Sequence, residues 1–88
     1  MQESRTIFFL LAEFDTGHIM LDRCAHHFGL SADEEKPAAT RQSLPVPAFR
    51  LGSQKSPWLI SAIDLAHYID SQREAAGRDW SKINSTYV

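Results

Sequence analysis

Four histidines, one cysteine and eleven carboxylates are the residues with which this 88-residue chain could carry out acid–base, nucleophilic or metal chemistry. His26 and His27 are adjacent, so on a helix their side chains point about 100° apart and are not expected to chelate a metal together. Cys24 has no second thiol to pair with, and no metal-ligand spacing such as His-Glu-x-x-His occurs. We therefore expect no catalytic residue, no bound metal and no cofactor, and we do not expect an enzyme.

A second kind of chemistry, the binding of phosphates and base edges, is available between Lys36 and Lys55. This segment contains four cationic residues and no carboxylate, although the whole chain has a formal net charge of −2. Glutamine can bind adenine with both of its polar atoms, and arginine can bind guanine in the same way. The alternative is that these are ordinary solvated side chains. The candidate DNA-binding residues are Lys36, Arg41, Gln42, Arg50, Ser53, Gln54, Lys55 and Ser56.

A hairpin is predicted to position most of these side chains. Residues 46–60 contain two apolar runs around a polar tip punctuated by Gly52 and Pro57, which is typical of a β-hairpin with a longer loop. The alternation along the first run predicts Phe49 and Leu51 in the core. It leaves Arg50 in solvent, without a structural partner.

Two helices joined by a short turn are predicted before the hairpin. Residues 22–28 form the first, with Asp22 as its N-cap, and Gly29 is expected to end it in the left-handed conformation. Residues 31–43 form the second. Two helices around a short Gly-containing turn are typical of a helix-turn-helix, in which the second is the recognition helix.

The second helix of the pair contains both a start signal and a breaker. Ser31 and Glu34 have the spacing of a capping box. Pro37 either lies within one kinked helix or is the first residue of a restarted one, and we favour a single kinked or restarted helix.

The other elements complete a single domain over residues 1–88. The apolar spacing predicts a first helix with Ser4 as its N-cap, and a short strand that pairs with the hairpin. Gly77 is expected to end the last helix. The expected elements are a helix at 5–14, a strand at 18–21, helices at 22–28 and 31–43, a wing hairpin at 46–60, a helix at 61–77 and a C-terminal tail at 78–88. The expected fold class is α+β, mostly helical, with the element order of a winged helix-turn-helix.

The composition agrees with a small soluble protein, since 43% of the residues are hydrophobic. The longest apolar run, from Ile7 to Ala12, is far too short to span a membrane, and no cleavage site follows it. We expect a cytoplasmic protein that does not contact the membrane.

Four segments of the chain resemble the pyocin activator family, the PrtN-like proteins of pseudomonads and their phages. They are FLLAEF, LPVPAFR, GSQKSPWLI and DLAHYIDSQREAA, and GSQKSPW after LPVPAFR is the most specific. The resemblance covers about residues 6 to 80. It implies a small transcriptional activator, in a bacterial or phage-infected cell, that binds double-stranded promoter DNA upstream of bacteriocin or prophage genes. It also suggests kinship with excisionase-like and MerR-like winged helices.

Two other functions stay open. The chain could be a protein-interaction module that binds a repressor or RNA polymerase through Asp33–Glu35 and Trp80. It could also be an excisionase-like architectural protein whose wing bends DNA. A winged domain of this size contacts few base pairs, so a homodimer on two half-sites is expected.

Overall fold

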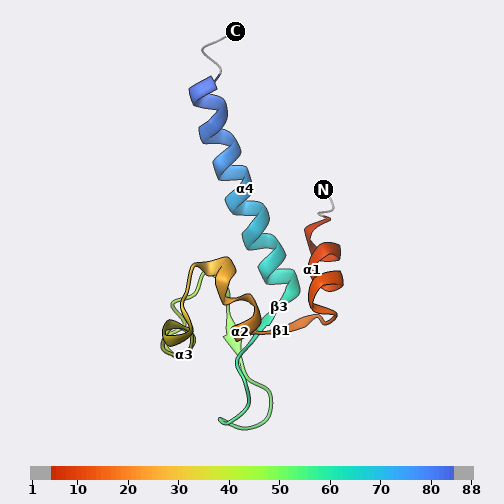
Figure 1. The fold of residues 1–88 in the computed structure, drawn as a ribbon, viewed down its shortest axis with the longest axis vertical. Coiled ribbons are helices and arrows are strands. Elements are labelled where there is room, and N and C mark those ends of the chain that lie inside the picture. The colour runs from red at the N-terminus through yellow and green to blue at the C-terminus, as the bar shows by residue number, and fades with distance from the viewer. Residues whose placement is uncertain (1–4, 85–88) are drawn as a thin grey trace.

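The structure is a computed structural model that describes residues 5–84. It is a mixed α+β fold in which a small sheet lies between helices and the last helix leads away from the body (Figure 1). The class predicted from the sequence is therefore confirmed, and the order of elements is compatible with a winged helix-turn-helix. The elements are α1 (Thr6–Phe14), β1 (His18–Met20), α2 (Leu21–Cys24), the 3-10 helix η1 (Ala25–Phe28), α3 (Ala32–Thr40), β2 (Ala48–Phe49), β3 (Leu59–Ser61) and α4 (Ala62–Asn84).

The sheet is antiparallel, with β3 in the centre and β1 and β2 at its edges. Ile60 on β3 pairs with Ile19 on β1 and with Ala48 on β2, and all three residues are buried on one face. This face forms one wall of the core. The predicted hairpin is confirmed, as is the pairing of the short N-terminal strand with it.

The predicted orientation of the first hairpin strand is wrong. Because Ala48 lies opposite the fully buried Ile60, the alternation of side chains puts Phe49 on the other face of the sheet. There Phe49 is half-buried against the edge of His18, with 5.8 Å between the ring centroids, and Leu51 is 59% exposed. The pairing of β2 with β3 sets this register, and the hydrophobicity of β2 alone gives the opposite one.

Helices α1 and α4 pack against each other and form the other wall of the core. Leu10 and Phe14 of α1 and Leu65 of α4 are buried there. The hydroxyl of Thr6 donates a hydrogen bond to the carboxylate of Asp70, which ties the start of α1 to the middle of α4.

The turns between the first elements follow local sequence signals. Asp15 adopts the left-handed conformation and ends α1, and Gly29, at φ 72°, ends η1 as predicted. The predicted cap Ser4 lies outside the described residues. Asp22 is not an N-cap, because α2 begins one residue earlier, with Met20 in the capping position. The predicted helix over 22–28 is in fact a single α-helical turn followed by η1.

Helix α3 begins with the predicted capping box. The carboxylate of Glu34 accepts hydrogen bonds from the backbone N–H of Ser31, at 2.8 Å, and from its hydroxyl, at 3.0 Å. Pro37 lies inside one continuous helix, so the restarted helix is not observed. The helix ends at Thr40, earlier than predicted, because Gln42 has a φ of 53° and turns the chain toward β2.

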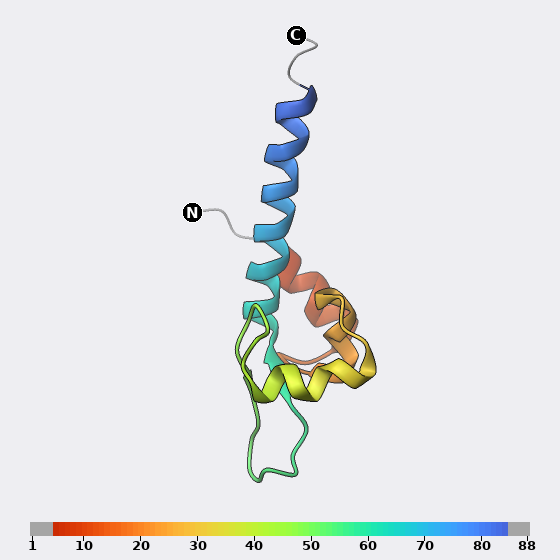
Figure 2. The same cartoon turned by 90° about the vertical axis from the view of Figure 1, so that its left-hand side faces the viewer.

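Helix α4 is longer than predicted, because it passes through Gly77 and ends at Asn84. The predicted C-terminal tail is therefore wrong for residues 78–84, which are helical. Residues 85–88 lie outside the described part of the chain. A single glycine lowers the stability of a helix interior by about 1 kcal/mol without ending the helix. The C-terminal half of α4 extends beyond the other elements (Figures 1 and 2). Within residues 5–84, no helix is both long enough and apolar enough to cross a membrane.

Candidate nucleic-acid interface

The loop between β2 and β3, residues 50–58, is called the wing here. It extends from the sheet at the end of the molecule that is farthest from the C-terminal end of α4 (Figure 1). Figure 2 shows α3 running across the molecule just above this loop. The predicted recognition helix and the predicted wing therefore lie at the same end.

The tip of the wing is held by hydrogen bonds within the loop. The carbonyl oxygen of Ser53 accepts a bond from the N–H of Ser56 at 3.1 Å, and its hydroxyl oxygen accepts one from the N–H of Lys55 at 3.2 Å. Gly52, at φ 86°, allows the chain to enter this turn. The turn exposes the side chains of Gln54 and Lys55 at its apex, whereas Ser56 is half-buried.

The prediction that Arg50 has no structural partner is wrong. Its guanidinium lies 4.1 Å from the centre of the Trp58 ring and donates a hydrogen bond to the carbonyl oxygen of Gln54. These contacts join the two sides of the wing. Arg50 is still an exposed residue, so it both stabilises the wing and adds positive charge to it.

Gln42 also has a structural role that its sequence position did not reveal. Its side-chain amide donates to the carbonyl oxygen of Ala48 at 2.9 Å and accepts from the N–H of Ala48 at 3.3 Å. Both polar atoms of the side chain are therefore used within the fold, in the arrangement that a neighbouring strand would provide.

The two cations of the α3 region lie on different sides of it. Lys36 lines a shallow cleft between α3 and the wing, together with Pro57 and Trp58. Arg41, five residues later and so about 140° around the helix axis, lies on the opposite side. The cationic candidate residues thus form two groups. Lys36 lies beside the wing, and Arg41 lies apart from both.

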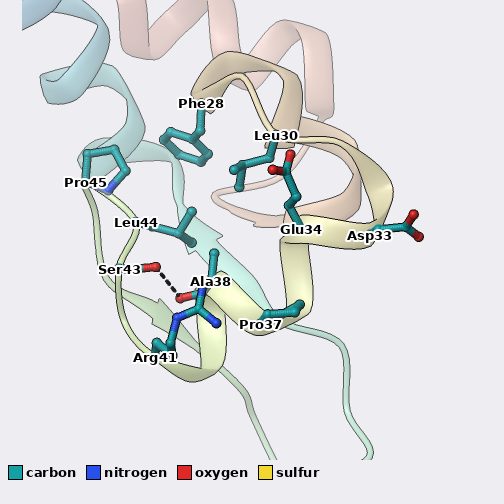
Figure 3. A pocket seen from close by; sticks show the side chains of 10 residues that line it. All are labelled: Phe28, Leu30, Asp33, Glu34, Pro37, Ala38, Arg41, Ser43, Leu44 and Pro45. Carbon is teal, nitrogen blue, oxygen red and sulfur yellow. Dashed lines mark hydrogen bonds between the residues drawn. The ribbon is translucent and has the colours of Figure 1, made fainter.

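Arg41 lies at the edge of a pocket that is shown in Figure 3. Phe28 and Leu44 form part of its apolar wall, and the Ser43 hydroxyl donates to the carbonyl oxygen of Ala38 at 3.3 Å. The acidic first turn of α3 reaches the same pocket through Asp33 and Glu34. Asp33 and Glu34 therefore lie on another side of α3 than Asp22 and Glu35, which line the cleft beside Lys36.

The shifted pKa values near α3 have structural causes. The N–H and hydroxyl of Ser31 stabilise the ionised form of Glu34 and lower the pKa of its carboxyl group. Burial, helped by the charges of Asp22 and Glu35, raises the pKa of the Cys24 thiol to about 11. Cys24 is therefore a protonated core residue at neutral pH.

The rings of His26 and His27 lie closer together than a separation of about 100° around a helix suggests. Their ring centroids lie 4.2 Å apart, and the carboxylate of Glu13 at the end of α1 lies beside them. Adjacent Cα atoms are only 3.8 Å apart, so side-chain rotation can bring the two rings together whatever the helical phase. Burial, and to a smaller degree the charge of His26, lower the pKa of His27, and Glu13 acts in the opposite direction. No sequence signal connects Glu13 to these histidines.

The fold and this site define a small α+β protein whose exposed, basic hairpin loop lies beside the second helix of a helix pair. This arrangement is compatible with a DNA-binding regulator. A family model described as pyocin activator protein PrtN matches residues 6–76, and the chain belongs to this family. Membership indicates a regulatory protein, a transcriptional activator of pyocin genes. Searches of curated proteins and of solved structures found no match.

Proposed function

We propose that the chain is a winged helix-turn-helix activator of bacteriocin or prophage-type genes that binds promoter DNA through the wing and the adjacent side of α3. The observation that carries this proposal is the wing itself. Its hydrogen-bonded tip exposes Gln54 and Lys55 without a carboxylate anywhere between residues 36 and 55.

The candidate residues have different roles in this proposal. Lys55 and Lys36 neutralise phosphates, and Gln54, with its side chain exposed at the tip, contacts a base edge in a groove. Ser53 and Ser56 shape the tip, and Arg50 supports it while it adds charge. Arg41 reaches only a flanking phosphate, because it lies on the other side of α3.

The acidic residues near α3 lie on both of its sides. Asp33 and Glu34 line the pocket on the far side of α3, so DNA at the wing does not meet them directly. Asp22 and Glu35 line the cleft beside Lys36 and lower the positive charge there. A second copy of the chain on a second half-site would extend the short stretch of base pairs that one wing and one helix contact. A promoter-bound activator also has RNA polymerase within reach.

The test is a salt titration of binding to a promoter fragment and to random DNA. Lys36→Ala and Lys55→Ala should each lower the slope of log affinity against log salt concentration by about 0.9, the value for one phosphate. Lys82→Ala is the matched control, because Lys82 is the one other lysine of the chain and lies near the far end of α4. Wild-type slopes for both interface variants would refute the proposed contact surface.

A second candidate function is favoured by exposed apolar side chains far from the wing. Phe8 and Phe9 on α1 and Trp80 on α4 are each more than 60% exposed. Exposed aromatic residues are typical of surfaces that bind another protein, such as a repressor or RNA polymerase. No binding to DNA at low salt would favour this role. Binding with strong bending, but without activation of transcription, would favour the excisionase-like role.

A further inference from the structure

We propose that Glu13, His26 and His27 form a binding site for a zinc-like divalent transition metal ion at the junction of α1 and η1. The site lies outside the proposed DNA interface, and the inference does not depend on DNA binding. It rests on the convergence of three ligand-type side chains from two different elements of the fold.

The geometry of the three side chains is close to what such an ion requires. One ligand atom from each residue lies within 4.8 Å of the other two. A tetrahedral zinc ion with bonds of about 2.1 Å holds its ligand atoms about 3.4 Å apart. Glu13 and His26 are exposed, so rotation of their side chains can close the difference without moving the backbone.

His27 provides a separate observation that points to a ligand. Its Nε2 atom is buried and makes no hydrogen bond with any of the described residues. The ring also packs edge-on against Phe14, with 6.4 Å between the ring centroids, which limits its movement. A buried nitrogen without a partner is costly, and a metal ion bound at Nε2 would offset that cost.

The ligand set selects the class of metal. Two imidazoles and a carboxylate suit zinc and the neighbouring first-row divalent ions, whereas magnesium and calcium prefer oxygen ligands alone. Cys24 is close in sequence but completely buried in the core, so it is not expected to contribute its sulfur. The fourth position is left to solvent. The bound ion would join the end of α1 to η1, the element that leads through Gly29 into α3.

The experiment is a titration of the full chain with zinc ions alone, followed by NMR of the imidazole ring signals of its four histidines. We expect saturable binding of one ion per chain that shifts the signals of His26 and His27 and leaves those of His18 and His67 in place. Shifts spread evenly over all four histidines would overturn the proposal.

Variants then test the ligand set, with affinity measured by competition against a chromophoric chelator. Glu13→Gln and His26→Ala should each weaken zinc binding about tenfold or more, since even the residues that support a metal ligand contribute that much. His67→Ala and Cys24→Ala are the matched controls and should bind as the wild type does. The test does not need His27→Ala, which could disturb packing against Phe14. Wild-type affinity in either Glu13→Gln or His26→Ala would overturn the three-ligand site.

Discussion

The contribution of Gln42 to the stability of the fold can be measured separately from any contribution to DNA binding. Gln42→Ala removes both hydrogen bonds to Ala48 and should lower the free energy of unfolding by about 1–2 kcal/mol. Urea denaturation measures the loss. Gln54→Ala is the control at the exposed tip of the wing, and it should change stability by no more than about 0.5 kcal/mol. Equal stability of the two variants would contradict the structural role of Gln42.

The two cations of the wing, Arg50 and Lys55, should also differ in how much they contribute to the free energy of unfolding. Lys55→Ala should leave the free energy of unfolding within about 0.5 kcal/mol of the wild type, because its side chain is exposed. Arg50→Ala loses the contact with the Trp58 ring and a hydrogen bond, and should cost about 1 kcal/mol. Arg50→Lys tests the cause, since lysine keeps the charge but loses the planar group. Equal urea midpoints for the two alanine variants would rule out this support of the wing by Arg50.

At the scale of one helix, α3 contains a proline that the fold tolerates at a cost. Pro37→Ala restores the N–H that could donate to the carbonyl oxygen of Asp33 and removes a steric conflict. Alanine also leaves the unfolded chain more flexible, which subtracts about 1 kcal/mol from the gain. A net stabilisation of about 1–2 kcal/mol in chemical denaturation is the expected result.

Pro45 supplies the comparison for that measurement, because it lies outside any helix. Pro45→Ala should show only the effect on the unfolded chain and should not raise stability. A neutral or destabilising Pro37→Ala would mean that Pro37 begins a restarted helix in solution.

Gly77 within α4 and Gly29 at the end of η1 are two glycines with opposite expected effects on stability. A Cβ atom at Gly77 would meet nothing within 4 Å, so Gly77→Ala should stabilise the protein by about 0.5–1 kcal/mol through helix propensity. Gly29→Ala should instead destabilise it, because φ there is 72°. Thermal unfolding followed by circular dichroism measures both. A loss of stability in Gly77→Ala would contradict a continuous helix at that point.

The elements that could be predicted from the sequence are those set by local chemistry. The capping box of Ser31 and Glu34 and the left-handed Gly29 depend on residues a few positions apart, and both were predicted correctly. The buried face of β2 and the full length of α4 were not predicted correctly. The first depends on pairing with a strand ten residues away, and the second on the absence of anything that stops the helix at Gly77.

The same distinction holds for the candidate site. The location of a basic wing beside a helix pair was predicted from the order of charges and turns. The contacts of Arg50 with Trp58 and of Gln42 with Ala48 were not, because they depend on how the chain folds back on itself. The convergence of Glu13 on His26 and His27 likewise requires the packing of α1 against η1.

At the scale of the whole molecule, Cys24 reports on the opening of the core. It is completely buried, and burial raises the pKa of its thiol to about 11, so little thiolate exists at pH 8 and none of it is accessible. Alkylation at pH 8 should therefore be slow in the folded protein and should accelerate in urea in proportion to the unfolded fraction. The denatured chain gives the limiting rate. Rapid alkylation of the folded protein would contradict a closed core around α2.

The side-chain amide of Gln42 also affects whether molecules of the protein associate with one another in solution. Strand β2 is an edge of the sheet, and an edge residue with an open N–H and C=O can recruit a strand from another molecule. Gln42 occupies both groups on Ala48 and so covers part of this edge with a side chain of the same molecule. Shortening that one side chain would uncover a short template for intermolecular strand pairing, so a small loss of stability would be accompanied by a tendency to aggregate at high concentration.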